Sequence, residues 1–79
     1  MWRTFSQGTA PQDDEFFVLV GQTILFARFE DDMFLVSDKH GGTFEPNEKI
    51  FQGSLSVFIE ENRETFGEEP KWKGIYLKN

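Results

Sequence analysis

The sequence predicts an α+β fold that is mainly β, an antiparallel meander of about four or five strands with one short helix. Three observations lead to this fold class. Three apolar runs are rich in β-branched and aromatic residues, short turns separate these runs, and a later segment has helical spacing. The 79 residues leave room for a single domain, 1–79, without an internal repeat or linker.

The first two strands are expected at 16–20 (FFVLV) and 23–29 (TILFARF), which are separated only by Gly21 and Gln22. Glycine at the first central position of a two-residue loop suits a type II′ turn. The twist of this turn matches that of the flanking strands, so the pair is predicted to form a β-hairpin.

The third strand is expected at 33–37 (MFLVS), directly after Glu30, Asp31 and Asp32. Aspartate tolerates the backbone conformations of a tight turn, and its side chain can bond its own backbone. The acidic triplet is therefore predicted to be a turn that completes a three-strand meander.

The predicted strands are apolar on both faces. A sheet with one wet face should alternate apolar and polar residues, but 16–20 and 23–29 hardly alternate. A chain of this length can hardly cover both faces of a sheet. Two explanations stay open, a sheet that closes into a small all-β barrel and a second chain that covers one face.

The segment 54–66 contains two competing periods, because its apolar residues alternate as in a strand and also recur at helical spacing. The polar stretch EENRETF favours the helix, since it has too many polar residues to continue a strand. The expected signals at the helix ends are a serine N-cap and a glycine stop, Ser54 or Ser56 and Gly67.

The remaining segments are assigned from the residues that interrupt regular structure and from their apolar residues. Paired glycines, a proline and an asparagine predict a turn and a loop over 38–49. The segment 71–78 (KWKGIYLK) is expected to form the closing strand, with Trp72 in the core.

The composition indicates a soluble, cytoplasmic protein. Ten Phe and two Trp supply a dense core, and the absence of cysteine, which removes disulfides and thiolate metal sites, suits a reducing compartment. The segment 1–12 lacks the apolar stretch of a signal peptide, and no run approaches the roughly 20 apolar residues of a membrane span. We therefore expect no membrane association.

The net charge of −6 disfavours direct binding to nucleic acid, because phosphate recognition normally requires a basic patch. Negative charge keeps a phenylalanine-rich domain soluble, and it also suits a basic partner through electrostatic steering. In the predicted meander, the loop before the first strand and the turn after the second lie at the same end of the sheet. The candidate partner-binding residues are Asp13, Asp14, Glu15, Glu30, Asp31 and Asp32.

Metal-binding and catalytic patterns are weak in this sequence. The triplet at 30–32 lacks the alternating oxygens, central glycine and final glutamate of a Ca²⁺ loop. His40 is the only histidine, and Gly41 and Gly42 after it predict a turn. We expect no metal, no cofactor and no enzymatic activity, and a small hydrolase built around His40 is the enzymatic alternative.

Several features recur in a recognisable order: Trp2, Pro11, an acidic run, FVLV, a strand ending in ARF, an acidic turn, and Trp72. In this order the chain resembles a family of small, uncharacterised phage and prophage domains. It departs from the family's pattern where DD replaces an Asp-Gly turn and where KWKGIYLK lacks prolines. In size and acidity the chain is also similar to anti-CRISPR proteins, phage-encoded inhibitors that bind and block CRISPR effector complexes.

The resemblance and the charge together imply a non-catalytic acidic binding protein, a phage-derived inhibitor in the cytoplasm of a bacterial host. Its expected partner is a host protein or ribonucleoprotein complex with a basic, nucleic-acid-binding groove. The alternative is a self-associating structural or regulatory module, a homodimer in which a second copy covers the apolar sheet face.

Overall fold

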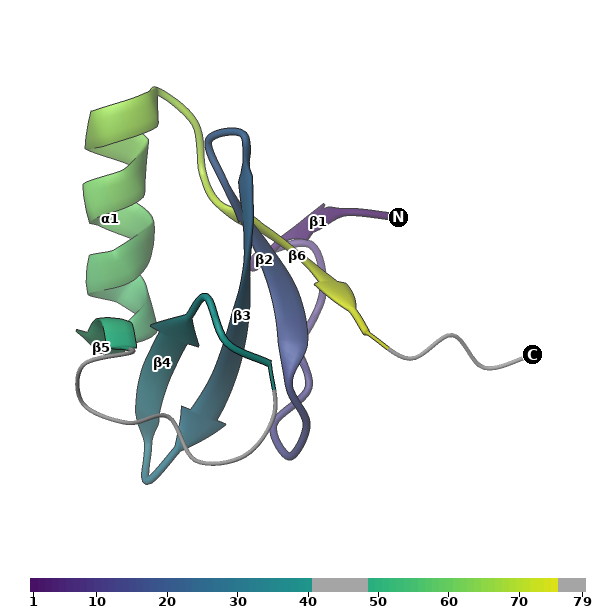
Figure 1. The fold of residues 1–79 in the computed structure, drawn as a ribbon. Coiled ribbons are helices and arrows are strands. Elements are labelled where there is room, and N and C mark those ends of the chain that lie inside the picture. Colours follow the sequence, from purple (N-terminus) through teal and green to yellow (C-terminus); the bar gives the residue numbers. More distant parts are fainter. Residues whose placement is uncertain (41–48, 76–79) are drawn as a thin grey trace.

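The computed structural model of the protein describes residues 1–40 and 49–75, which form one antiparallel sheet with a helix on one side (Figure 1). The sheet has six strands in the order β1-β6-β2-β3-β4-β5. The elements are β1 (Arg3–Thr4), β2 (Phe16–Val20), β3 (Thr23–Glu30), β4 (Met33–Ser37), β5 (Lys49–Gly53), α1 (Leu55–Phe66) and β6 (Lys71–Gly74). The predicted α+β, mainly β fold is confirmed, and the sheet is open at β1 and β5 instead of closed into a barrel.

Two of the six strands have no counterpart in the prediction of about four or five. β1 is two residues long and pairs with β6, near the other end of the described chain. β5 pairs with β4 and shifts register between Val36 and Ser37. Each depends on a partner outside its own segment, so no local pattern marks it. Residues 41–48, within the predicted loop, and residues 76–79, at the end of the predicted closing strand, lie outside the described residues.

Both hairpin turns of the meander have the conformations that two-residue loops require. Gly21 has a φ of 62° while the φ of Gln22 is negative, as in a type II′ turn. Asp31 and Asp32 have φ values of 52° and 64°, the pattern of a type I′ turn. The predicted meander β2-β3-β4 is confirmed together with its two turns.

The helical alternative for the later segment is correct. Ser54 is the N-cap, and its Oγ accepts a hydrogen bond from the Val57 N–H at 3.2 Å. Gly67 ends the helix with a φ of 75° and donates its N–H to the Arg63 carbonyl at 2.9 Å. Phe58 points into the core and is buried. Within the described residues, α1 is too short and too polar to cross a membrane.

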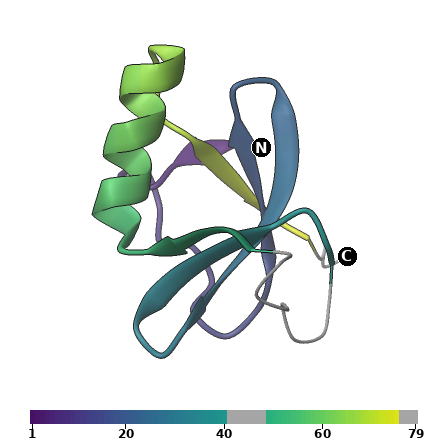
Figure 2. The same cartoon turned by 60° about the vertical axis from the view of Figure 1, so that its left-hand side comes forward.

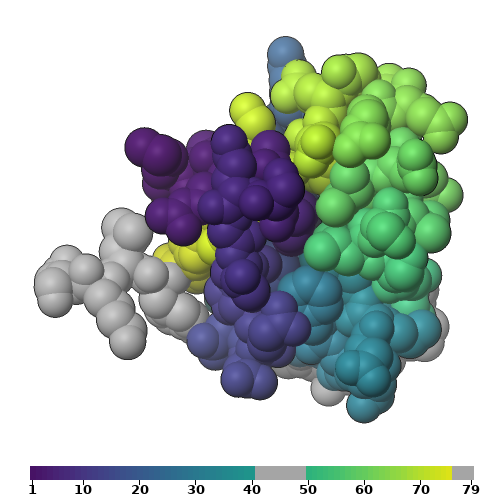
Figure 3. Space-filling model, turned by 180° about the vertical axis from the view of Figure 1, so that it is seen from behind, coloured from purple at the N-terminus to yellow at the C-terminus, as the bar shows by residue number. Residues whose placement is uncertain are grey.

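The core lies between one face of the sheet and two covers, α1 and the N-terminal segment (Figures 2 and 3). Phe5 belongs to this segment, and its ring centroid lies 5.7 Å from that of Phe34 and 6.3 Å from that of Phe16. Trp72 is only 8% exposed, as predicted. The buried cluster consists of Ala10, Phe16, Val18, Ala27, Phe34, Val36, Phe58 and Trp72.

The other face of the sheet carries a second apolar layer, which the chain itself partly covers. Phe17 and Phe26 are cross-strand neighbours whose ring centroids are 5.5 Å apart, and the His40 ring lies 4.9 Å from that of Phe26. Lys73 pairs with Phe17, and its Nζ lies 6.0 Å from the centroid of the Trp2 ring. These contacts cover part of the outer apolar face, which explains in part why β2 and β3 are apolar on both faces.

Candidate functional site

Two acidic loops converge at one end of the sheet. The loop that leads into β2 and the turn between β3 and β4 lie at the same end, opposite the β2-β3 turn (Figures 1 and 2). An open depression of about 460 Å³ joins them, lined by Gln12, Asp13, Phe29, Glu30, Asp31 and Asp32. The acidic end surface, as we call it, consists of Asp13, Asp14, Glu30, Asp31 and Asp32.

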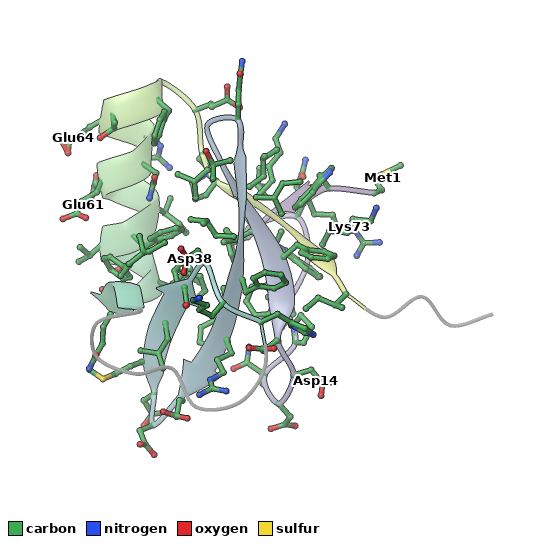
Figure 4. The ribbon with its side chains drawn as sticks, in the orientation of Figure 1. Met1, Asp14, Asp38, Glu61, Glu64 and Lys73 are labelled. Atoms are coloured by element: carbon green, nitrogen blue, oxygen red, sulfur yellow. The ribbon has the colours of Figure 1, made fainter. Side chains whose placement is uncertain are left out.

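Asp13 and Asp14 reach this surface because the chain bends at 12–14 before it enters β2. Both residues are exposed. Asp13 lines the depression, whereas Asp14 lies next to it and projects into solvent at the same end (Figure 4). The loop therefore contributes one carboxylate inside the depression and one at its margin.

The β3-β4 turn holds its charges in a costly conformation. Aspartate tolerates the left-handed region better than most residues, but glycine is preferred at the second position of a type I′ turn, as in Asn-Gly or Asp-Gly. Here Asp31 and Asp32 occupy both left-handed positions, so two like charges are also adjacent. The sequence of this turn thus retains charge where other residues would favour stability.

Few cations balance the acidic end surface. Arg28, next to the turn on β3, makes an ion pair with Glu30 at 3.2 Å between Nη2 and Oε2. Within the described parts of the chain, Asp13, Asp14, Asp31 and Asp32 form no ion pair. Such surface pairs contribute little to stability, and the local excess of negative charge produces a field that a cationic partner would experience.

Glu15 belongs to the same loop but faces a different part of the molecule. One of its carboxylate oxygens lies 2.9 Å from Nδ1 of His40, and its side chain is only 12% exposed. His40 also stacks on Phe26, so the pair lies on the outer face of the sheet. The structure brings five of the six predicted residues to the acidic end surface and places Glu15 elsewhere. Glu15 and His40 are 25 positions apart, and no local pattern predicts their contact.

A second acidic region lies on α1 and just after its end. The exposed glutamates of this region are Glu60, Glu61 and Glu64 on the helix and Glu68 after Gly67. Glu61 and Glu64 project from the solvent side of the helix (Figure 4), and none of the four lines the depression. Arg63 on the same helix pairs with Glu69 at 3.1 Å. This acidic region of α1 is therefore separate from the acidic end surface.

Two of the serine hydroxyls are used in local structure. Ser37 Oγ accepts a hydrogen bond from the Lys39 N–H at 3.0 Å, and Ser54 Oγ caps α1. Among the described residues, no three histidine, cysteine or carboxylate side chains are grouped so that they could hold a metal ion. The acidic end surface presents its carboxylates to solvent.

Comparison with protein-family models, with curated proteins and with solved structures finds no match to this chain. The resemblance to phage and anti-CRISPR proteins stays a prediction from the sequence. Function therefore has to be argued from the charges, contacts and exposure of this chain's own residues.

Proposed function

We propose that this protein acts by binding and not by catalysis. Its acidic end surface docks on a basic groove of a nucleic-acid-handling protein or ribonucleoprotein complex and blocks that groove sterically and electrostatically. This is the action of an inhibitor of the anti-CRISPR kind, as the sequence resemblance implies. No direct contact with nucleic acid is needed, because the carboxylates occupy the positions of phosphates.

One observation carries the proposal. Carboxylates from two separate loops share one depression, and the β3-β4 turn supplies its part with two aspartates in left-handed conformations. Asn-Gly or Asp-Gly is the usual pair at these positions, so Asp31 fits the turn and Asp32 stands where glycine is preferred. A second aspartate in place of glycine adds charge at a modest conformational cost, as is expected where charge serves binding.

The physics of such a contact predicts a fast, salt-sensitive association. Opposite surface potentials steer encounter and raise the association rate, and added salt screens exposed charges beyond a Debye length of about 8 Å at physiological ionic strength. Specificity would then come from the shape of the depression and from side chains such as Phe29 at its wall.

The test compares two triple variants with the same change in net charge. In one, Asp13, Asp31 and Asp32 are replaced by lysine. In the helix control, the lysines replace Glu60 and Glu64 on α1 and Glu68 just after it. Each variant is immobilised beside the wild type, and host lysate is applied at low and at high salt.

We expect the wild type and the helix control to retain a basic, nucleic-acid-binding protein or complex at low salt. The end-surface variant should lose it, and both high salt and added single-stranded nucleic acid should displace it. Retention by the end-surface variant, or binding that salt leaves unchanged, would contradict the proposal.

A homodimeric module is the second candidate, and one observation favours it. Ile24 is 54% exposed on the outer face of the sheet, beside the half-buried Leu19 and Phe26. A second copy could cover this apolar face. Sedimentation velocity at micromolar concentration should then show a dimer without any partner, and a monomer at all concentrations would exclude this candidate.

A further inference from the structure

A groove and an unpaired stretch of strand lie between β3 and α1, at the end of the sheet opposite the acidic end surface. β4 pairs with β3 only from Phe26 to Glu30, whereas β2 accompanies β3 as far as Thr23. Within the described residues, the stretch Thr23–Leu25 therefore has a strand on one side only. α1 runs along the open side, beside the β2-β3 hairpin (Figures 1 and 2).

The hairpin register shows which backbone groups are free at this edge. In a two-residue hairpin, Val20 and Thr23 exchange backbone hydrogen bonds, and the bonded pairs then alternate along the strands. The N–H and C=O of Ile24 consequently point away from β2, toward the open side. An unpaired strand edge of this kind is a template for another strand.

A groove of about 200 Å³ lies beside this edge. Its lining residues are Val20, Leu25, Ile50, Phe51, Phe58, Glu61, Asn62 and Thr65. Apolar side chains of the sheet and the core form most of its wall, and the polar residues all come from α1. A strand added next to Ile24 would direct alternate side chains into this groove, because side chains alternate between the faces of a sheet.

We propose that this groove binds an extended peptide of a partner protein, which adds to the free edge of β3 as a short antiparallel strand. Two apolar side chains, at positions i and i+2, enter the groove opposite Thr23 and Leu25. The residue between them exchanges hydrogen bonds with Ile24 and faces outward. Strand addition of this type combines backbone hydrogen bonds with pockets for alternate side chains.

The charge of the rim selects a basic peptide. Glu61 lines the groove, and Glu64 is its exposed neighbour at i+3 on α1. Within the described residues, neither glutamate forms an ion pair. Lysine or arginine beside the apolar residues therefore complements the rim, whereas an acidic peptide is repelled.

The test is an NMR titration of the ¹⁵N-labelled protein with the acetylated, amidated peptide Lys-Val-Lys-Val-Lys. Shift changes should saturate and centre on Ile24, Leu25, Glu61, Asn62 and Thr65. The peptide Glu-Val-Glu-Val-Glu reverses the charge, and Lys-Lys-Val-Val-Lys places the valines on opposite faces. Both control peptides should bind at least about tenfold more weakly.

Variants locate the site. Ile24→Pro removes the free N–H without touching the β2 ladder and should weaken binding at least about tenfold, whereas Ile24→Thr keeps the donor and should stay within about threefold. Thr65→Phe fills the groove from the exposed helix surface and should also weaken binding about tenfold, which serves if Ile24→Pro fails to fold. Glu61→Gln should weaken binding more than the matched Glu64→Gln.

Three results would overturn the proposal: no saturable binding of Lys-Val-Lys-Val-Lys, undiminished binding to the folded Ile24→Pro or Thr65→Phe variant, and shift changes centred on the acidic end surface. The site is independent of the proposed function. Lysines at positions 13, 31 and 32 should leave peptide binding unchanged, so either proposal can fail alone.

Discussion

The two turns at the ends of β3 solve the same geometric problem with opposite chemistry. Both reverse the chain in two residues and both need positive φ. The β2-β3 turn meets this need with Gly21, which also packs against Phe66 of α1. The β3-β4 turn uses Asp31 and Asp32 and gains two exposed charges. The first turn favours folding, and the second presents the charges that the proposed binding surface uses.

The largest expected effect is at the first turn. A Cβ on Gly21 would approach Cε1 of Phe66 to 2.8 Å, at a φ of 62°. We expect Gly21→Ala to lower the free energy of unfolding by roughly 1–3 kcal/mol, measured by urea denaturation.

Gly67→Ala is the matched control for this substitution. Gly67 has a similar φ of 75°, and no atom lies within 4 Å of a Cβ built there. Gly67→Ala should lower the free energy of unfolding by about 1 kcal/mol, through the backbone conformation alone. Equal costs at both positions would show that the Phe66 ring moves aside and contributes nothing to the first turn.

Substitution at the second turn should stabilise the protein, in contrast to substitution at the first. Asp31→Asn combined with Asp32→Gly provides the preferred type I′ pair and removes two like charges. It should raise the free energy of unfolding by about 1 kcal/mol and weaken binding to the basic partner. A variant that is more stable and still binds would remove the distinction between the two turns.

Salt should separate the two contributions at the second turn. Repulsion between exposed carboxylates is screened at high ionic strength, while the conformational cost is not. The Asn-Gly replacement raises the free energy of unfolding, and this increase should become smaller by a few tenths of a kcal/mol between about 0.05 and 0.5 M NaCl. Urea unfolding at the two salt concentrations measures it. If the increase in the free energy of unfolding were the same at both salt concentrations, all of it would come from backbone conformation.

The smallest effect distinguishes the acidic end surface from its neighbour Glu15. Glu15 faces His40, so Glu15→Gln should leave partner binding unchanged and shift stability by less than about 1 kcal/mol. Asp13→Asn removes a charge that lines the depression and should weaken partner binding. Titration calorimetry with the identified partner compares them, and equal effects would extend the surface to Glu15.

Local chemistry explains why the meander and the helix were predictable. A glycine at the first turn position, aspartates at the second turn, Ser54 as N-cap and Gly67 as stop act on neighbouring backbone atoms. The convergence of the two acidic loops also follows, because alternate connections of an antiparallel meander lie at one end of the sheet. These features require no knowledge of distant contacts.

The sequence by itself thus determined a small α+β fold with an acidic end, since turns, caps and runs of β-branched and aromatic residues are local features of the chain. Only the tertiary structure decided the pairing of β1 with β6, the packing of Phe5 against the core, the contact of Glu15 with His40 and, among the described residues, the unpaired stretch of β3. Each of these joins segments that are separated in the chain or depends on where a neighbouring strand stops. Such contacts arise from the packing and register of the whole sheet, which no single segment encodes.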